Sequence, residues 1–297
     1  MNGAGAQAMA PQAADKSTVA IICGGGAFPA AIADAVLAQG RPVYLFLVKG
    51  FADAALERYP HEWVKIGALA KFVASSRKHG AKDIVIIGSS VRPRLSQIGF
   101  DWKSALLLPR LARMFLGGDN SLLSGVAKIF EENGLTVRGA HEVAPQILMP
   151  EGLATRLLPN AKENEAIKAG RDLLRAIDGF DVGQAVVVAG KRIVAIEGAE
   201  GTQGLLARVE EMRRNGRLRL GAREGVLVKL PKPSQDRRLD LPAIGIDTIA
   251  QAKAAGLAGI AVEARGSIVV DAQKFVEAAE QAGLFVVALP PSARAMG

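Results

Sequence analysis

The sequence predicts an α/β protein of two domains, a Rossmann-like domain with a parallel sheet followed by a second α/β domain. Short apolar runs alternate with helical patterns, a glycine-rich turn follows the first run, and a polar connection (MPEGLATRLLPNAKENE) begins near Pro150. Strands that alternate with helices are typical of a parallel, doubly wound sheet. Because 297 residues are enough for two ordinary cores, we expect two domains with a ligand cleft between them.

Composition sets the expected boundaries. Residues 1–17 are mostly small and polar and lack the apolar stretch of a secretory signal, so we expect a disordered leader there. The N-terminal domain is expected over residues 18–150 and a C-terminal catalytic domain over residues 151–297.

The expected N-terminal domain contains two loops that follow apolar strands, the glycine turn at 24–28 and the segment 89–92. Ligands of parallel sheets bind at the carboxyl ends of the strands, so we expect these loops to be neighbours around one nucleotide. Pro29 suits the first turn of the helix that follows the glycines. The predicted strands are 19–23, 43–48, 84–87 and 136–138, and the predicted helices are 29–39, 67–79 and 121–133.

The expected second domain shows the same alternation, with one hairpin joined by a turn at Gly190 and Lys191. The predicted strands are 185–188, 192–196, 226–229, 260–263, 267–270 and 285–289, and the predicted helices are 163–177, 203–215, 246–255 and 272–282.

The glycine turn invites comparison with the dinucleotide fingerprint. Aligning Gly24 and Gly26 with its first two glycines puts Pro29 at the third, and Lys49 stands where a ribose-binding acid is normally found. NAD is therefore disfavoured. A phosphate or sugar on backbone N–H groups, or a tight turn without a ligand, remains open.

Charge and composition narrow the class of partner. The formal net charge of +8 favours an anionic partner, while 5% aromatic residues and scattered basic residues disfavour nucleic acid. The single cysteine, Cys23, cannot form an intrachain disulfide, so we expect a cytoplasmic protein. Cys23 itself is expected to be buried and chemically inert. Five arginines in 212–223 fit either a solvated helix end or peripheral contact with an anionic inner-membrane surface. A homo-oligomer is compatible with the sequence.

The segment 225–245, GVLVKLPKPSQDRRLDLPAIG, differs most from ordinary core sequence. Pro231 and Pro233 enforce an extended loop that holds neighbouring charges at set spacings. Cations suit phosphate oxygens, and a carboxylate suits Mg²⁺ or an attacking water. The alternative is a solvated charged loop.

Nine motifs in one order make the chain resemble the Mg²⁺-dependent UDP-2,3-diacylglucosamine pyrophosphatases of lipid A biosynthesis, the LpxI-type family. The resemblance covers nearly all of the chain after the leader. It implies hydrolysis of the substrate pyrophosphate to UMP and 2,3-diacylglucosamine 1-phosphate (lipid X), with water attacking the α phosphorus. The motifs are GGGAFP (24–29), FADAALERYP (51–60), GSSVRP (88–93), GGDNSLL (117–123), GAHEV (139–143), DVGQAVVV (181–188), EGAEGT (197–202), KLPKPSQDRRLDLPAIG (229–245) and AGLAGIAVEA (255–264).

The resemblance implies that Asp240 is the essential carboxylate, either as a metal ligand or as a base that orients the water. Glu200 is expected as a second Mg²⁺ ligand, with Asp236 and Glu263 as further candidate carboxylates. His141 is expected near the cleft or as a structural hydrogen-bond donor. The expected substrate-binding residues are Gly25, Gly26, Ala27, Ser90, Val91, Asp119, His141, Thr202, Lys229 and Lys232.

One departure and two alternatives accompany this resemblance. The family usually has EGTDA where this chain has EGTQG, so Gln203 weakens metal binding if that position is a ligand and is harmless if it is a helix cap. The apolar segment 102–116 is either core or a wall for acyl chains. A non-catalytic protein that binds UDP-sugars or acidic lipids needs only the cleft and the basic surface. A Rossmann-type oxidoreductase would need a ribose-binding acid, which this chain lacks at the expected position.

Overall fold

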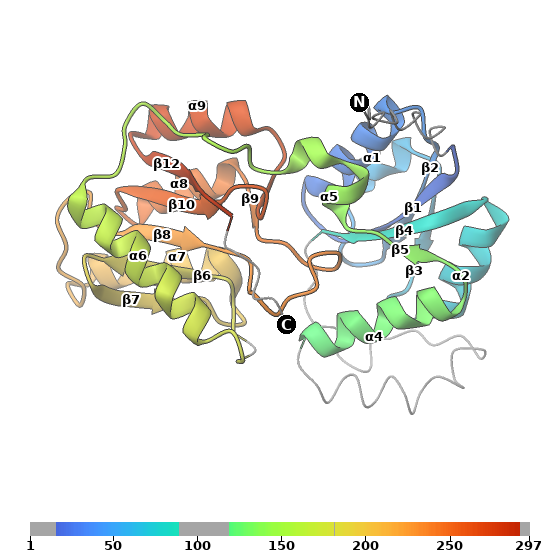
Figure 1. Ribbon diagram of the computed structural model, residues 1–297, viewed down its shortest axis with the longest axis horizontal. Coiled ribbons are helices and arrows are strands. Elements are labelled where there is room, and N and C mark those ends of the chain that lie inside the picture. Colours follow the sequence, from blue (N-terminus) through green and yellow to red (C-terminus); the bar gives the residue numbers. More distant parts are fainter. Residues whose placement is uncertain (1–15, 89–118, 181, 292–297) are drawn as a thin grey trace, which may run out of the picture.

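The chain forms two α/β lobes side by side, each built on a five-stranded sheet (Figure 1). The computed structural model describes residues 16–88, 119–180 and 182–291. The expected α/β class and two-lobe architecture are confirmed. Within the described residues, no helix is both long and apolar enough to cross a membrane.

The N-terminal sheet has the strand order β3-β2-β1-β4-β5 with every pair parallel, as the alternating pattern predicted. The central strands β1 and β2 are largely buried on both faces, which explains why their sequences are continuous apolar runs. The strands are β1 (Thr18–Cys23), β2 (Val43–Val48), β3 (His61–Val64), β4 (Ala81–Ile87) and β5 (Thr136–Val137).

Helices cover both faces of this sheet. One face packs against α1 (Phe28–Ala38), α5 (Ala140–Val143) and the 3-10 turn η4 (Pro145–Ile147). The opposite face packs against α2 (Leu69–Lys78) and α4 (Asp119–Glu132).

The edge strand β3 was not predicted, and neither was the 3-10 turn η1 (Ala54–Arg58) before it. The sequence of β3, HEWV, begins with two polar residues, and its first three residues are only partly buried. An edge strand needs little apolar surface, so the pattern that predicted the central strands fails here.

The C-terminal sheet has the order β12-β10-β8-β6-β7. The strands β8, β10 and β12 are parallel, whereas β6 runs antiparallel to β8 and forms a hairpin with β7. The expected hairpin turn is confirmed, with Gly190 at a left-handed φ of 56°. The strands are β6 (Ala185–Ala189), β7 (Arg192–Ile196), β8 (Val226–Lys229), β10 (Gly259–Glu263) and β12 (Phe285–Leu289).

The two faces of this sheet are also covered. The helix α6 (Ala161–Ala176) packs on one face, and α7 (Gly201–Arg214), α8 (Ile246–Ala254) and α9 (Ala272–Ala282) pack on the other. Figure 1 shows α9 and α6 on opposite sides of the strands.

A third, two-stranded sheet lies between the lobes. It pairs β9 (Ala243–Ile244) with β11 (Ile268–Val269) in parallel, and Ile268 also forms a bridge with Leu148. Ile268 belongs to the apolar cluster beneath α1 in the N-terminal lobe. Elements of the C-terminal sequence therefore complete the core of the N-terminal lobe.

Candidate active site at the carboxyl edge of the C-terminal sheet

The carboxyl edge of the C-terminal sheet collects polar side chains from four strands. Lys229 ends β8 and Glu263 ends the neighbouring parallel strand β10. Glu197 follows β7, and Gln184 precedes β6, whose first residue lies at this edge because the strand runs antiparallel to β8. Ligands of open α/β sheets bind outside this edge, so we take it as the candidate site.

Asp240 reaches this edge from the loop between β8 and β9. Its carboxylate oxygen Oδ2 accepts hydrogen bonds from the side-chain amides of Gln184 and Gln235. The flanking Leu239 and Leu241 are buried in the two cores of the N-terminal lobe. The N-terminal lobe therefore holds the loop on both sides of the carboxylate, while the carboxylate itself contacts the C-terminal lobe.

Two opposing influences act on the Asp240 carboxyl group. Burial raises its pKa, because a charged carboxylate is less well solvated there than in water. The positive charge of Lys229 and the hydrogen bonds from Gln184 and Gln235 lower the pKa. A carboxylate with a raised pKa is a stronger base, and the nearby cation favours its ionised form.

Lys229 belongs to a directed chain of hydrogen bonds. Its ammonium group donates to the hydroxyl of Thr202 at 2.8 Å and to the backbone carbonyl of Ala243 at 2.9 Å. The Thr202 hydroxyl donates to the Glu197 carboxylate at 2.7 Å. Burial lowers the pKa of Lys229, and the charges of Glu197 and Asp240 oppose that shift. The expected phosphate contacts of Lys229 and Thr202 stay predictions.

Lys232, the second expected phosphate-binding lysine, is buried in the same loop. Its backbone N–H donates to the side chain of Gln235, and its backbone carbonyl accepts from the Gln235 N–H. This turn fixes the amide that reaches Asp240. The charge of Lys232 also lowers the pKa of Asp240, so it acts on the expected carboxylate.

Glu200, the second expected metal ligand, is turned toward solvent at the start of α7. Its carboxylate pairs with Arg208 at 2.8 Å. In the part of the chain that the structure describes, no group of three or more His, Cys, Asp or Glu side chains forms a metal cage. Gln203 is exposed on the same helix. The structure thus does not bring Glu200 into the Asp240 network.

Asp236 and Glu263, the further candidate carboxylates, are both paired with arginines. Asp236 contacts Arg238 at 2.7 Å, and Arg238 continues to Glu131 of α4 at 2.8 Å, which links the two lobes. Glu263 is 1% exposed and pairs with Arg237 at 3.1 Å. These pairs hold the charged loop in place.

The glycine turn with Gly25, Gly26 and Ala27 lies at the carboxyl end of β1, as predicted. Gly26 has a left-handed φ of 90°. A Cβ atom added to Gly88, after β4, would lie 2.7 Å from the carbonyl carbon of Gly24. The residues that lead into the two N-terminal loops therefore lie backbone against backbone. The loop 89–92 itself lies outside the described residues, so its expected place beside the glycine turn stays a prediction.

Of the other expected residues, some lie within the described part of the chain and some lie outside it. Ser90, Val91 and the apolar segment 102–116 lie outside the described residues, and Asp119 begins α4. His141 lies in α5 near the charged loop. A Cβ atom added to Gly139 would lie 2.4 Å from the His141 ring and 3.1 Å from the Cα atom of Arg238, so all three residues are close together. The expected position of His141 near the cleft stays a prediction.

Sequence reasoning missed three residues of this network, Gln184, Gln235 and Glu197. All three stand inside motifs that carried the family resemblance, yet amides were not considered as partners of the catalytic carboxylate. The Gln184 Oε1 atom is buried and has no hydrogen-bond partner within the described residues. A buried acceptor beside Asp240 suits a water molecule or a substrate hydroxyl group.

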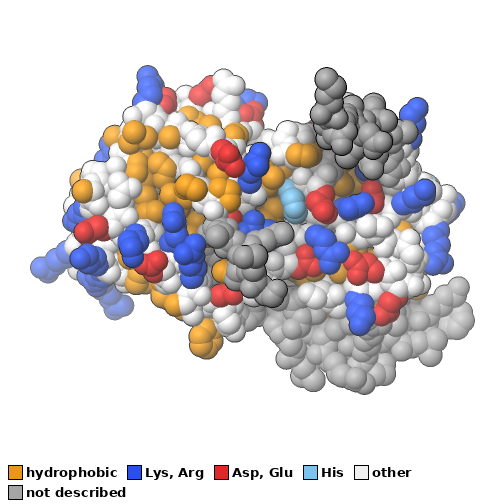
Figure 2. Space-filling model, in the orientation of Figure 1, with side chains coloured by type: hydrophobic (Ala, Val, Ile, Leu, Met, Phe, Trp, Pro, Cys, Tyr) orange, Lys and Arg blue, Asp and Glu red, His pale blue; other side chains and the backbone are white. Residues whose placement is uncertain are grey.

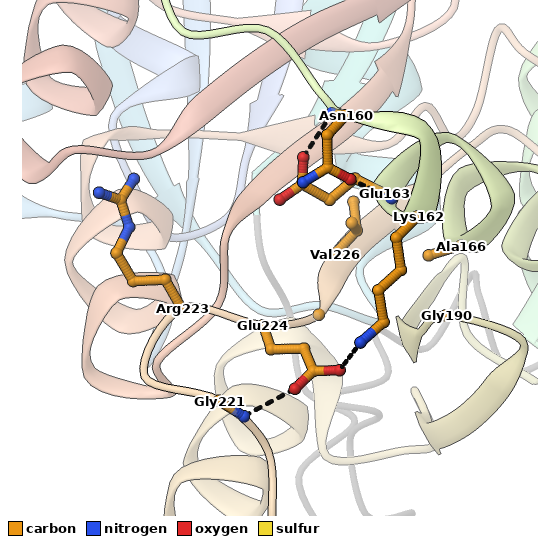
Figure 3. A pocket seen from close by; sticks show the side chains of 10 residues that line it. Asn160, Lys162, Glu163, Ala166, Gly190, Gly221, Arg223, Glu224 and Val226 are labelled. Atoms are coloured by element: carbon orange, nitrogen blue, oxygen red, sulfur yellow. Dashed lines mark hydrogen bonds and ion pairs between the residues drawn. The ribbon is translucent and has the colours of Figure 1, made fainter.

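A cavity of about 220 Å³ lies at the other end of the C-terminal sheet (Figure 3). Gly190 and Val226 line it together with the start of α6, and Lys162 pairs with Glu224 across it. This cavity is remote from Asp240, because Val226 begins the strand that Lys229 ends. The expected cleft between the lobes stays a prediction.

Comparison with known proteins identifies the family. Residues 18–147 match the LpxI N-terminal domain and residues 150–287 match the LpxI C-terminal domain. The UDP-2,3-diacylglucosamine pyrophosphatase LpxI of Caulobacter vibrioides is 38% identical over 274 residues, which cover 92% of this chain and 98% of that protein.

Solved structures resemble the chain only weakly. UDP-N-acetylglucosamine 4-epimerase from Bacillus cereus has a TM-score of 0.31 and 9% identity, and the alignment covers 93% of this chain and 75% of that one. The biotin carboxylase domain of a thermophilic 2-oxoglutarate carboxylase has a TM-score of 0.22 and 10% identity, with 67% and 41% covered. These likenesses carry no functional argument. The sequence matches to both lobes do, and by them this chain belongs to the LpxI family.

Proposed function

We propose that this chain hydrolyses the pyrophosphate bond of UDP-2,3-diacylglucosamine and releases UMP and 2,3-diacylglucosamine 1-phosphate. The observation that carries this proposal is the 38% identity to the Caulobacter vibrioides enzyme of that name over nearly the whole length of both proteins. The Asp240 network at the carboxyl edge of the sheet supports it, because it combines a basic carboxylate with nearby cations.

In this proposal water attacks the α phosphorus, a new P–O bond forms, and the bond to the bridging oxygen breaks. Asp240 orients the water and accepts its proton, or holds the metal ion. Lys229 and Lys232 offset the negative charge that develops on the phosphates. The glycine turn at Gly25 and Gly26 offers backbone N–H groups to the nucleotide part of the substrate.

In this proposal Asp240 would hold a Mg²⁺ ion, with the substrate and water supplying the ligands that the described residues do not gather. Mg²⁺ is commonly bound by one or two carboxylates, with phosphate oxygens and water completing its shell. Asp240 would supply the carboxylate, while Glu200 is engaged with Arg208. When bound, the ion would polarise the phosphoryl oxygens and lower the charge that the attacking water meets.

The test is release of UMP from UDP-2,3-diacylglucosamine by the purified protein, with Mg²⁺ and with EDTA. UDP-N-acetylglucosamine, which has no acyl chains, is the control substrate. We expect release from the diacylated substrate alone, and its loss in EDTA. Saturable binding without UMP release would contradict the proposal and indicate a binding protein instead.

We further propose that the protein works in the cytoplasm and touches the anionic inner-membrane surface while it handles its diacylated substrate. Four exposed arginines follow one another at the end of α7 and in the turn after it, Arg214, Arg217, Arg219 and Arg223. Figure 2 shows Lys and Arg side chains gathered toward the outer end of the C-terminal lobe. Each such residue near an anionic bilayer contributes about 1 kcal/mol of attraction.

A further inference from the structure

The carboxylate of Glu197 has no role in the reaction proposed above, yet both of its oxygens are used at the edge of the Asp240 site. Glu197 follows β7 and is 7% exposed. Its Oε2 accepts from the backbone N–H of Gln184 at 2.7 Å, and its Oε1 accepts from the hydroxyl of Thr202 at 2.7 Å. Burying a carboxylate costs free energy unless donors and a cation match it.

The matching cation is Lys229, and the hydroxyl of Thr202 fixes the direction of the connection. A hydroxyl group can donate only one hydrogen bond, and Thr202 donates it to Glu197. The Thr202 oxygen therefore accepts a hydrogen bond from the Lys229 ammonium group at 2.8 Å. Lys229 also donates to the backbone carbonyl of Ala243. Glu197 thereby sets the position of the Lys229 ammonium group through the hydroxyl of Thr202.

Backbone packing ties Glu197 to Gln184 as well. A Cβ atom on Gly183 would lie 2.3 Å from the Glu197 Cγ and 2.5 Å from its Oε2. Only a glycine at 183 leaves room for the carboxylate to reach the N–H of Gln184. The side-chain amide of that same Gln184 donates to Asp240. The carboxylate thus fixes the backbone from which this amide reaches Asp240.

The charges facing Lys229 are those of Glu197 and Asp240, and both raise its pKa against the effect of burial. Lys229 in turn lowers the pKa of Asp240. Loss of the Glu197 charge would therefore leave Lys229 easier to deprotonate and Asp240 with a weaker cationic neighbour.

We propose that Glu197 is a positioning residue of this site. It holds the Gln184 amide and, through Thr202, the Lys229 ammonium in the places from which both act on Asp240, and it does not touch the substrate. The proposal rests on the proposed function only where turnover is measured.

The first test needs no substrate. NMR of the full chain labelled with ¹³C in its lysine side chains, with the Lys229 signal assigned from Lys229→Arg, gives the titration midpoint of Lys229. We expect Glu197→Gln to lower that midpoint by about one pH unit or more, because a partner charge of opposite sign is lost. Glu263→Gln, which removes another buried carboxylate at the same edge, should leave it in place. An unchanged midpoint in folded Glu197→Gln would overturn the proposal.

The second test separates positioning from folding. Glu197→Gln should lower kcat for UMP release about tenfold or more, with KM changed less than about threefold. Thr202→Val should show the same fall in kcat and the same small change in KM. Thr202→Ser should keep nearly wild-type kcat and KM, because serine retains the bridging hydroxyl. This pair also decides the matter if Glu197→Gln does not fold. Equal losses in Thr202→Val and Thr202→Ser would refute the bridge, whereas a wild-type protein without turnover would refute only the reaction.

Discussion

Asp240 receives two amide donors on a single oxygen, and this asymmetry has a consequence for its replacement. Asparagine has nearly the same shape, but it is neutral and can neither accept a proton from water nor bind a cation strongly. The amides of Gln184 and Gln235 can still donate to its carbonyl oxygen. The loop should therefore keep its conformation while the chemistry is lost.

Asp240→Asn is accordingly expected to bind UDP-2,3-diacylglucosamine with nearly wild-type affinity and to lose UMP release by at least about 100-fold. Calorimetric titration gives the binding and a coupled UMP assay gives the turnover. Near-normal turnover in the folded variant would remove Asp240 from the mechanism.

Gly88 is a second position where one atom decides the outcome. Its φ is 103°, and a Cβ would lie 2.7 Å from the carbonyl carbon of Gly24, so Gly88→Ala forces two backbones apart. We expect Gly88→Ala to lower the free energy of unfolding by about 2 kcal/mol or more, measured by urea titration. Gly80→Ala, with a φ of 68° and open space around it, is the matched control and should cost about 1 kcal/mol. Equal losses would show that the contact with Gly24 is unimportant.

At the scale of elements, the loop between β8 and β9 is shaped by the alternation of Leu239, Asp240 and Leu241. Leu239 lies in the cluster with α2 and α4, and Leu241 lies in the cluster with α1 and α5. Leu239 ends a turn in which the backbone N–H groups of Leu239 and Asp240 both donate to the carbonyl of Asp236. With a buried leucine on either side, the Asp240 carboxylate is left to reach Gln184. The N-terminal lobe thereby acts on the site without supplying the carboxylate.

Leu241→Ala should test this. It is expected to cost about 2–4 kcal/mol of stability and also to lower kcat more than tenfold, because Asp240 loses its anchor. Leu56→Ala removes a side chain from the same cluster away from the loop, and it should lower stability alone. Chemical denaturation and UMP release on both variants make the comparison. The same fall in kcat for both would argue against an anchoring role.

Regular elements with strong patterns could be predicted from the sequence, and contacts that depend on strand direction could not. The runs in β1, β2 and β8 are continuous and apolar, so their pattern was sufficient. The two-residue strand β9 offers too few residues for any period. Gln184 reaches Asp240 only because β6 is antiparallel, and a sequence pattern gives no strand direction. Asp240 itself came from the family resemblance rather than from spacing.

At the scale of the whole molecule, the positive charge at the end of α7 can be tested for binding to anionic lipid. Arg217→Gln with Arg219→Gln should reduce co-sedimentation with vesicles of anionic lipid, and raised salt should do the same to the wild-type protein. Lys78→Gln with Lys82→Gln removes the same charge from exposed positions of the N-terminal lobe and should have a smaller effect. Equal effects of the two pairs would indicate a response to net charge rather than to this surface.

The burial of Leu239 and Leu241 in the opposite lobe also bears on how the chain can be divided. A fragment that ends near residue 150 would carry the first sheet complete, yet one of its apolar clusters would lack Leu239 and the other would lack Leu241 and Ile268, which come much later in the sequence. Such a truncated protein would expose two unfilled hollows to water. Expression of the halves as separate polypeptides should therefore yield aggregation-prone material, and co-expression should let each half rescue the other.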